Sequence, residues 1–468
     1  MNNILDIVFK NKFTKSIALM DDYNSVTYLE LHDKIINTAL SLKSLGISKN
    51  CKVVIFENNS IDFFILFFSL KHIGSIPILI NTSVNDKELK QILEKSKPNY
   101  IFFKNKKIKK HISEEKSGSF LSYNFCETSY LIDNSLENVG VFLHTSGTSG
   151  DIKIVALSDK NLITGAKGTK HNRNVTENDV LYLILPVTFI FGLNLSLGIL
   201  YSKGSIFIAE KFEVSHVRNF KKYKISMLSL TPVGLSRIVE IMKEKQIKKS
   251  LIRYVSYGGD TLSEEEKLHI SNFFNLNLVN GYGMTETTAT ISINNGNDKG
   301  VGKVVNGLQI KFLKNNKFNN NEGEIFLKGD TIGLGYYTEE QGIISFLENS
   351  WFRTGDYGKI DNGNLILFGR LKDLIFASTD FYTSIEIEED INKISKSISI
   401  VLQDKGFLYV FIKNLSNIDL KKVRDLLNKK YNIFDILFFN LKKIPVSHNG
   451  KIKRRELLKK VDKFNINT

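Results

Sequence analysis

The sequence predicts an α/β fold, with a large N-terminal domain of βαβ-type sheets and an antiparallel sub-region, followed by a small α+β C-terminal domain. Three observations lead to this prediction. A chain of 468 residues is longer than a single compact core usually supports, so two domains are expected. The first half alternates short apolar runs with helical patterns, which is typical of βαβ units. From about Lys303 the pattern changes to short strands separated by turn residues.

Apolar runs bounded by turn residues predict the elements of the first half in order. The first units are expected as strand 52–57, helix 61–73, strand 76–81, helix 86–95 and strand 100–104. Further strands are expected at 205–209, 227–230, 254–257 and 278–280. Because these runs are almost continuously apolar, they predict a parallel sheet that is covered by helices on both faces.

The second part of the chain is predicted to be antiparallel at first and α+β at the end. Short strands with turn signals are expected at 307–313, 315–322, 323–327 and 362–367. A boundary near 369–373 divides the chain into domains 1–370 and 371–468. In the second domain, helices 384–394 and 419–429 alternate with strands 399–402 and 408–412.

The segment 181–201 contains no charged residue and approaches the hydrophobicity of a membrane span. Its interior carries Pro186, Gly192, Asn194 and Gly198. This spacing of polar residues and helix breakers suits a buried strand, a turn and a buried helix better than one continuous span. We therefore assign the segment to the core and expect no integral membrane segment.

The two cysteines, Cys51 and Cys126, are too few for a disulfide framework and are not spaced as a C-x-x-C motif. They favour a reduced, cytoplasmic setting. The first ten residues mix Asp6 and asparagines into a short apolar run, so no export signal is expected.

The net charge is +15, from 64 Lys and Arg against 49 Asp and Glu. From Leu371 onward there are 19 basic and 12 acidic residues, so the excess is concentrated at the C-terminus. A nucleic-acid or membrane-surface binder would account for the charge, but no zinc-finger, RNA-binding or basic-helix signature accompanies it. No nucleic-acid partner is expected.

The first chemical motif follows an apolar run at 139–143. It consists of Thr145, Ser146, Gly147, Thr148, Ser149 and Gly150, with Lys153 three residues further on. Glycines leave backbone N–H groups free to turn toward an anion, hydroxyl groups add donors, and a lysine adds charge. The motif is therefore a candidate phosphate-binding loop. It is not a Walker A loop, because the G-x-x-x-x-G-K-[ST] spacing does not fit.

This loop resembles the phosphate-binding signature of the adenylate-forming (AMP-binding) ligases, a superfamily that contains acyl-CoA synthetases, nonribosomal-peptide adenylation domains and luciferases. Four further blocks occur in the order typical of that superfamily. They are Gly281-Tyr-Gly-Met-Thr-Glu286, Gly323-Glu-Ile-Phe-Leu-Lys-Gly329 with Gly335-Tyr336, Arg353-Thr-Gly-Asp356 with Gly369-Arg370, and Asn449-Gly-Lys451. The resemblance covers about residues 140–457 and implies an ATP-dependent acid–thiol ligase, which forms acyl-AMP, releases pyrophosphate and then makes a thioester.

The resemblance also implies a role for each block. The loop 145–150 and Lys153 would wrap the β- and γ-phosphates, Thr285 would contact the α-phosphate, and Glu286 would hold Mg²⁺, for which a carboxylate is a suitable ligand. Tyr282 would stack on adenine and Asp356, near Arg370, would accept hydrogen bonds from the ribose. Nucleotide contacts are further expected from Gly259, Asp260 and Gly283.

Lys451 is the expected catalytic lysine, because its counterpart in the superfamily bridges the carboxylate and the α-phosphate during adenylation. A lysine on a flexible stem at a loop tip suits a group that enters the site in one step and leaves in the next. Lys372 lies at the position of the superfamily's hinge, about which the small domain would rotate.

The acid-binding wall is expected from Phe189, Ile190 and Phe191, with Gly258 and Gly281 also contacting the substrate. Amino-acid-activating relatives carry an aspartate where this chain has Ile190, so an α-amino acid is disfavoured. An apolar wall instead favours an acyl or aryl carboxylic acid.

The thiol acceptor stays open between coenzyme A and the phosphopantetheine arm of an acidic carrier protein. Phe376 and Thr379 replace a lysine and a glycine that relatives usually carry in a loop of the thiol tunnel. The positive excess at the C-terminus, including Lys453, Arg454 and Arg455, would suit a carrier. A non-catalytic adenylate-binding descendant is a further alternative, opposed by the presence of Lys451 and Glu286.

Overall fold

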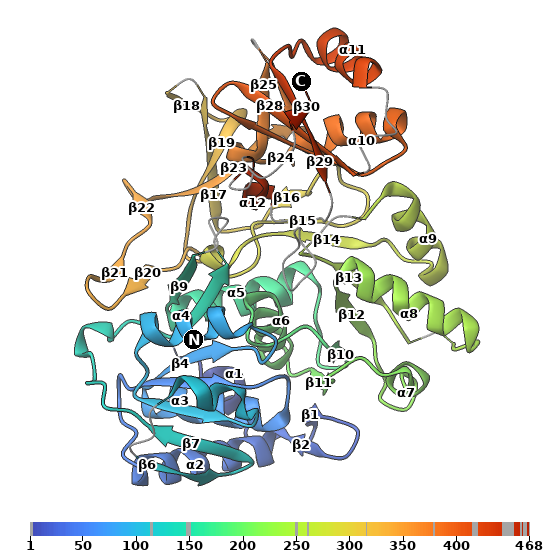
Figure 1. Cartoon of the computed structure of the whole chain (residues 1–468). Coiled ribbons are helices and arrows are strands. Elements are labelled where there is room, and N and C mark those ends of the chain that lie inside the picture. Colours follow the sequence, from blue (N-terminus) through green and yellow to red (C-terminus); the bar gives the residue numbers. More distant parts are fainter. Residues whose placement is uncertain are drawn as a thin grey trace.

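The computed structural model describes residues 3–112, 116–146, 151–248, 251–259, 262–314, 316–377, 380–413, 420–441, 454–458, 461 and 466–467. The described residues form two nine-stranded sheets, a six-stranded sheet, a two-stranded ribbon and a four-stranded sheet. In Figure 1 the first strands, β1 to β7, lie in the lower part of the view, and α10 and α11 lie near the top. The predicted α/β class is confirmed.

The first nine-stranded sheet has the order β21-β20-β9-β8-β4-β3-β5-β7-β6. Its strands are β3 (Lys52–Phe56), β4 (Ile76–Ile80), β5 (Tyr100–Phe103), β6 (Lys116–Phe120), β7 (Tyr123–Glu127), β8 (Val141–Ser146), β9 (Ile152–Leu157), β20 (Gly335–Thr338) and β21 (Gly342–Ile344). Helix α3 (Ile61–Ile73) has the predicted bounds, and α4 (Asp86–Ser96) is one residue longer than predicted.

The second nine-stranded sheet has the order β16-β15-β14-β13-β12-β10-β11-β1-β2. Its strands are β1 (Ile17–Met20), β2 (Ser25–Thr27), β10 (Val180–Leu183), β11 (Ser205–Ile208), β12 (Met227–Leu230), β13 (Tyr254–Tyr257), β14 (Val279–Tyr282), β15 (Ser292–Asn294) and β16 (Lys303–Val304). The helices around it are α1 (Asp6–Phe9), α2 (Tyr28–Ser44), α5 (Asp159–Asn172), α6 (Ile190–Tyr201), α7 (Val214–Arg218), α8 (Pro232–Glu244) and α9 (Glu264–Phe274).

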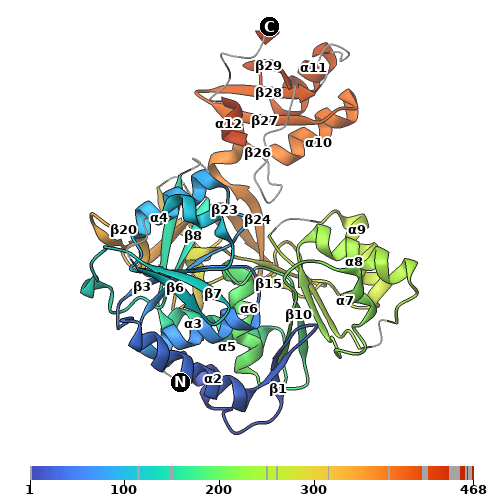
Figure 2. The same ribbon diagram turned by 60° about the horizontal axis from the view of Figure 1, so that its bottom comes forward.

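The two large sheets share one core. Side chains of β3 and β8 from the first sheet and of β10 and β12 from the second pack into a single cluster with α3, α5 and α6. Helices α8 and α9 cover the opposite face of the second sheet, and α4 covers the opposite face of the first. In Figure 2, α5 and α6 are drawn between the two sheets. The apolar segment 181–201 forms β10 and the buried α6, as predicted, and no helix in the described part of the chain is long and apolar enough to cross a membrane.

The parallel pairing predicted for the strands of the first half is confirmed, and antiparallel strands that were not predicted extend the edges of both sheets. Strands β3, β4, β5 and β8 are parallel, but β9, β20 and β21 on one side and β7 and β6 on the other are antiparallel. The second sheet is parallel from β1 to β14 and antiparallel at β2, β15 and β16. Short connections join β1 to β2, β6 to β7, β8 to β9 and β20 to β21 at these edges, whereas parallel pairing needs a longer crossover connection.

The predicted antiparallel sub-region is present as the six-stranded sheet, with β24 paired to β23. Its strands are β17 (Leu308–Lys314), β18 (Lys317–Asn319), β19 (Glu322–Gly329), β22 (Leu347–Glu348), β23 (Trp351–Asp361) and β24 (Asn364–Arg370). Strand 315–322 was predicted too long, because β18 ends at Asn319 and β19 already begins at Glu322.

After Arg370, the turn η4 (Leu371–Asp373) leads into the ribbon of β25 (Leu374–Ala377) and β26 (Asp380–Thr383). The final sheet consists of β27 (Ser399–Asp404), β28 (Phe407–Lys413), β29 (Ile436–Leu441) and β30 (Ile466–Asn467). Its helices are α10 (Ser384–Ser395), α11 (Leu420–Tyr431) and α12 (Arg454–Leu458). It has hydrophobic clusters of its own.

Candidate active site

A cavity of about 750 Å³ lies where both large sheets meet the six-stranded sheet and η4. Seven residues that the sequence singles out line it: Thr145, Lys153, Gly283, Thr285, Glu286, Arg370 and Lys372. Its other lining residues are Met284, Glu324, Tyr336, Phe352, Arg353, Thr354, Gly355 and Leu371. Residues from four separate sequence blocks therefore surround one space.

The phosphate-loop motif is placed by the β8–β9 hairpin. Thr145 is paired with Lys153 across this hairpin, and the backbone of Ser146 with that of Ile152. The Nζ atom of Lys95, from α4, lies 2.8 Å from Oδ1 of Asp151 and 2.7 Å from the carbonyl oxygen of Ile152. The return strand is thus anchored beside the loop. Gly147, Thr148, Ser149 and Gly150 lie outside the described residues.

The block that contains Glu286 turns tightly at η3 (Thr285–Thr287). A side chain at Gly283 would overlap the carbonyl oxygen of Ala289, so the close approach of these two backbone segments requires glycine. Thr288 and Ala289 have φ angles of 52° and 80°, in the left-handed region. Non-glycine residues hold this conformation only when their surroundings enforce it, and such strain is frequent at functional sites.

Tyr336 connects Glu286 with Lys153. Its hydroxyl group donates a 2.7 Å hydrogen bond to Oε1 of Glu286, and Nζ of Lys153 lies 4.3 Å from the centroid of its ring. Burial, and then the Glu286 carboxylate, raise the pKa of Tyr336 above its ordinary value, so the phenol stays protonated and donates. The same tyrosine therefore holds a carboxylate at its hydroxyl group and an ammonium group over its ring.

A Mg²⁺ ion fits this arrangement only if a bound nucleotide and water supply most of its oxygen ligands. Among the described residues, no group of three or more His, Cys, Asp or Glu side chains could hold a metal ion. Glu286 supplies one carboxylate, and the remaining oxygen ligands of a bound ion would come from phosphates and water, as is usual for Mg²⁺ at nucleotide sites.

Asp356 is enclosed by other side chains at the junction of β23 and β24. Nε of Arg370 lies 3.0 Å from its Oδ1, and the Tyr282 hydroxyl group donates a hydrogen bond to its Oδ2. Only 3% of Asp356 is exposed, and this burial raises the pKa of its carboxyl group, while Arg370 opposes the rise. Burial also raises the pKa of Tyr282 well above its usual range.

The predicted acid-binding residues do not line the cavity described above. A Cβ atom at Gly258 would lie 3.0 Å from the ring of Phe191, so these two residues pack together as expected. The ring of Phe189 lies 5.7 Å from that of the buried His144. Ile190 is 7% exposed and belongs to the shared core, so it is Phe191 that contacts Gly258. Gly259 is exposed with φ +85°.

Two of the remaining expected residues, Asp260 and Lys451, lie outside the described part of the chain. Lys453 also lies outside it. The carrier-docking hypothesis assumed that Arg454 is an available surface charge, but the structure shows it paired with a carboxylate. Its Nη2 atom donates a 2.8 Å hydrogen bond to Oε2 of Glu388, and Nη1 donates to the same carboxylate. Both Nη atoms of the guanidinium group are therefore used in this bidentate ion pair within the protein.

Sequence reasoning assigned no role to three cavity residues, Tyr336, Glu324 and Arg353. Nε of Arg353 donates a 2.7 Å hydrogen bond to Oε1 of the buried Glu324, so this pair forms part of the cavity wall. All three lie inside the quoted motif blocks. Their presence in those blocks could have identified them as candidate site residues. The sequence does not show, however, which residues of a block face the cavity.

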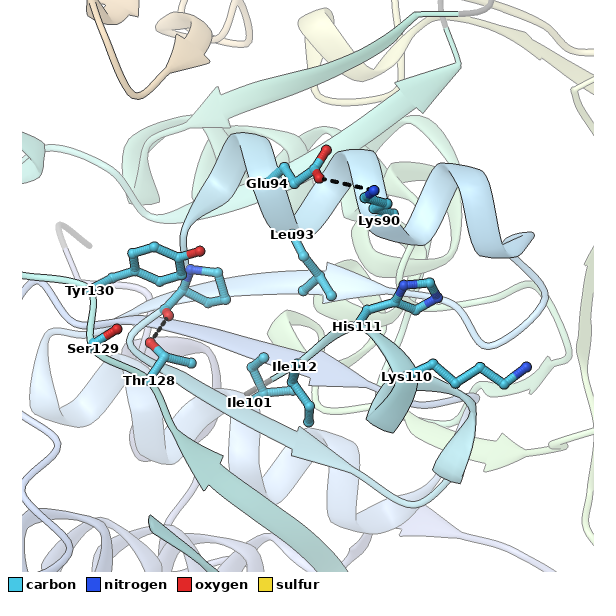
Figure 3. Close-up of a pocket in the computed structure, with 11 residues that line it drawn as sticks. Lys90, Leu93, Glu94, Ile101, Lys110, His111, Ile112, Thr128, Ser129 and Tyr130 are labelled. Atoms are coloured by element: carbon cyan, nitrogen blue, oxygen red, sulfur yellow. Dashed lines mark hydrogen bonds and ion pairs between the residues drawn. The ribbon is translucent and has the colours of Figure 1, made fainter. Parts of the chain in front are cut away.

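A separate cavity of about 550 Å³ lies beside α4 and contains none of the predicted site residues. Figure 3 shows Leu93, Glu94 and Lys90 of α4 on one side, and Ile101, Ile112 and His111 across from them. Its polar groups come from surface segments, and Glu94 and Lys90 pair with each other at 3.7 Å. We assign no chemistry to it.

Comparisons with known proteins agree with these motifs. Residues 9–337 match the family model described as AMP-binding enzyme. The chain is 26% identical to the 2-succinylbenzoate–CoA ligase of Oceanobacillus iheyensis over 388 residues, covering 80% of each chain. It is 25% identical to the ligase of the same name from Lactococcus lactis subsp. lactis, covering 93% of this chain and 96% of that one.

Solved structures show the same fold. O-succinylbenzoate coenzyme A synthetase from Bacillus subtilis in complex with ATP and magnesium ion superposes with a TM-score of 0.79 at 21% identity, covering 97% of this chain and 99% of that one. The same enzyme in complex with AMP gives a TM-score of 0.78 at 20% identity, covering 97% and 98%.

The expected adenylate-forming, acyl-CoA synthetase-like enzyme is confirmed, and with it the class of AMP-forming acid–thiol ligase. A non-catalytic binder is therefore set aside. The match to the family model extends over most of the chain and includes the phosphate-loop strands, the η3 block and β20. The chain belongs to the AMP-binding enzyme family.

Proposed function

We propose that this protein uses ATP and Mg²⁺ to activate a non-amino, aryl-bearing carboxylic acid as acyl-AMP, releases pyrophosphate, and transfers the acyl group to coenzyme A. The observation that carries the proposal is the cavity that joins Lys153 and Glu286 to Arg370, the partner of Asp356. One bound nucleotide would span this cavity. Its phosphates would lie toward Lys153 and Glu286, and its ribose toward Asp356.

In this proposal the protein acts mainly by charge and positioning. Negative charge that spreads over the phosphate oxygens during attack on the α-phosphorus is stabilised by fixed cations and donors. Lys153 and the hydroxyl groups of Thr145 and Thr285 line the cavity and provide these groups. A bound Mg²⁺ would neutralise phosphate charge, and Glu286 would hold it.

The acid is proposed from the pocket and from the relatives together. Phe191 packs on Gly258, so an apolar side chain lines this part of the predicted acid site and would suit an apolar substrate group. The buried Ile190 offers no carboxylate for a substrate ammonium group. The relatives in two organisms are named for 2-succinylbenzoate, an aryl acid without an amino group. That acid, or one of similar shape, is the proposed substrate.

Coenzyme A is the proposed acceptor, because the relatives are named as CoA ligases. The pairing of Arg454 with Glu388 removes one of the charges on which docking of an acidic carrier protein depended. Lys451 remains the proposed adenylation lysine. Residues 371–468 remain the proposed mobile domain, with Lys372, at the cavity wall, as its hinge. We place the reaction in the cytoplasm, where Cys51 and Cys126, which are buried and form no disulfide with each other, would stay reduced.

The test is acid-dependent exchange of labelled pyrophosphate into ATP. Exchange with 2-succinylbenzoate, its loss in Glu286→Gln and its persistence in Glu340→Gln, an exposed control, would support the proposal. No exchange with any acid in a broad panel would overturn it. Formation of a thioester with free coenzyme A then tests the second half-reaction separately.

A further inference from the structure

Arg173, which caps the C-terminus of α5, has a guanidinium group that is buried without a carboxylate partner among the residues that the structure describes. Only 4% of the residue is exposed. Nη1 donates a 2.5 Å hydrogen bond to the Tyr254 hydroxyl group, and the guanidinium lies 5.8 Å from the centroid of that ring. Nε has no partner. A buried charge is costly unless it is paired, so this cation needs a counter-charge.

The guanidinium group of Arg173 lies beside Gly281, which the sequence predicts to contact the acid. Within 4 Å, a Cβ atom placed at Gly281 would meet only Nη2 of Arg173, at 3.7 Å, so Gly281 faces this nitrogen. Gly258, which directly follows the neighbouring strand β13, faces the ring of Phe191, and its own Cβ would lie 3.8 Å from the carbonyl oxygen of Gly281. The guanidinium and the apolar wall therefore border neighbouring parts of one sheet face.

A second buried polar group contacts α5 about one turn before Arg173. Asn194 of α6 is 3% exposed, and its Nδ2 donates a 3.1 Å hydrogen bond to Oγ1 of Thr169 on α5. Its Oδ1 has no partner among the described residues. A side chain at Gly165 would come within 2.5 Å of this oxygen. Buried polar groups normally have partners, so two unmet groups on the α5–α6 side indicate a polar ligand or ordered water.

We propose that Arg173 binds a second carboxylate of the acid substrate, remote from the carboxylate that is adenylated. The proposal rests on the proposed function and narrows the substrate class to dicarboxylic acids with an apolar spacer. A planar guanidinium suits a carboxylate because it can donate two parallel hydrogen bonds. Loss of a hydrogen-bonded charge in a buried site lowers affinity by about 10- to 100-fold.

A purely structural Arg173 makes a different prediction. A cation at a helix C-terminus is favoured by the helix dipole, and the Tyr254 ring adds a cation–π contact. In that case, replacing Arg173 would lower stability and would affect every acid equally. Discrimination between matched acids therefore separates the two roles.

The experiment measures pyrophosphate exchange of the full chain with two matched pairs of acids. The first pair is 2-succinylbenzoate and 4-oxo-4-phenylbutanoate, which lacks only the ring carboxylate. The second is hexanedioate and hexanoate. The variants are Arg173→Met, Arg173→Lys and, as a control, Arg237→Met, whose exposed arginine on α8 pairs with Glu240.

The wild type is expected to favour the diacid of at least one pair by about 10- to 100-fold in kcat/KM. Arg173→Met should remove this preference by raising KM for the diacid. Its KM for ATP and its kcat/KM for the monoacid should stay within about twofold of the wild-type values. Arg173→Lys should restore part of it, and Arg237→Met should match the wild type. If Arg173→Met does not fold, reduced diacid preference in Arg173→Lys, with unchanged monoacid kinetics, supports the assignment.

Two results would overturn the role of Arg173 and leave the proposed function intact. One is an equal kcat/KM of the wild type for both acids of each pair. The other is an equal decrease of kcat/KM for both acids in the Arg173 variants. Exchange with no acid at all would instead overturn the proposed function. The two failures are therefore distinguishable in one data set.

Discussion

The hydroxyl group of Tyr336 donates a 2.7 Å hydrogen bond to Oε1 of Glu286, although the two residues come from different sequence blocks. Tyr336 lies on β20, which pairs with β9, and its backbone partner is Val155, two residues after Lys153. The same ring also faces the Lys153 ammonium group. Tyr336 therefore positions the proposed metal ligand and the proposed phosphate ligand together.

Tyr336→Phe should raise the Mg²⁺ concentration for half-maximal exchange by about 3- to 10-fold, because Glu286 loses a hydrogen bond to its charged form. The measurement is a Mg²⁺ titration at saturating ATP and acid. Tyr337→Phe is the matched control, because the neighbouring hydroxyl group bonds to Glu339 instead. An unchanged Mg²⁺ requirement in Tyr336→Phe would count against the positioning role.

Asp356→Ala should weaken ATP binding by at least tenfold with a smaller effect on kcat, since a ribose contact exists in both the ground and the transition state. Calorimetric titration of ATP measures the affinity directly. Asp361→Ala, at the other end of β23, removes a half-exposed carboxylate 3.7 Å from Lys299 and should leave ATP affinity unchanged. Equal affinities in both variants would refute the assignment of Asp356.

Lys451→Ala should lower the adenylation rate by about 100-fold or more while ATP affinity and the melting temperature stay near wild type. The reason is that the Lys451 ammonium group is proposed to stabilise only the negative charge that develops in the transition state. Single-turnover formation of acyl-AMP measures the step, and Lys421→Ala, on the exposed surface of α11, is the control. Normal adenylation in Lys451→Ala would remove this residue from the mechanism.

Gly283→Ala should lower the melting temperature and abolish exchange, because the added methyl group overlaps the Ala289 carbonyl. Gly168→Ala is the contrasting variant. Gly168 lies inside α5, where only Nδ2 of Asn172 approaches, at 3.7 Å, and alanine should stabilise the helix by about 0.5–1 kcal/mol. Thermal unfolding of both variants tests the pair. A Gly283→Ala protein as stable and active as wild type would contradict the predicted overlap.

The free energy of unfolding should fall as the pH rises between 4.5 and 7 through the contribution of Glu57. Burial raises the pKa of this carboxyl group from 4.5 to about 7, although Lys104 opposes the rise. Within that window the native state keeps a proton that the unfolded chain has released, so the contribution is present at low pH and is lost, by up to about 3 kcal/mol, toward pH 7.

Urea unfolding at several pH values between 4.5 and 8 measures this slope. Glu57→Gln should flatten the dependence, whereas Glu94→Gln, which removes an exposed carboxylate on α4, should not. Parallel slopes in wild type and Glu57→Gln would show that another group is responsible.

Local features of the fold were predictable where the signal is contained in one short segment. Helix α3 was predicted with its observed bounds because both ends carry their own signals. Ser60 accepts a hydrogen bond from the backbone of Phe63 at the start, and Gly74 adopts a φ of 84° at the end. The buried strand and helix of 181–201 were predicted from polar residues and helix breakers in the same way.

Long-range pairing was not predictable. Nothing in the residues around Tyr336 shows that β20 pairs with β9, because register between distant strands depends on the whole sheet. Arg173 was missed for a related reason. It follows Lys170 and His171, so the segment has the composition of a solvent-exposed helix end, and its burial depends on Tyr254 and Gly281 from two other strands.

The pairing of β20 with β9 limits how the chain can be shortened. Strand β9 has an exposed position only at Lys153 and is otherwise buried, and β20 covers its outer edge. A truncated chain that ends before Gly335 would leave that edge unpaired, with Ile152, Ile154 and Ala156 beside it. Unpaired, apolar edge strands invite pairing with other chains. Such a fragment would therefore aggregate on expression, and a soluble fragment must extend beyond Thr338.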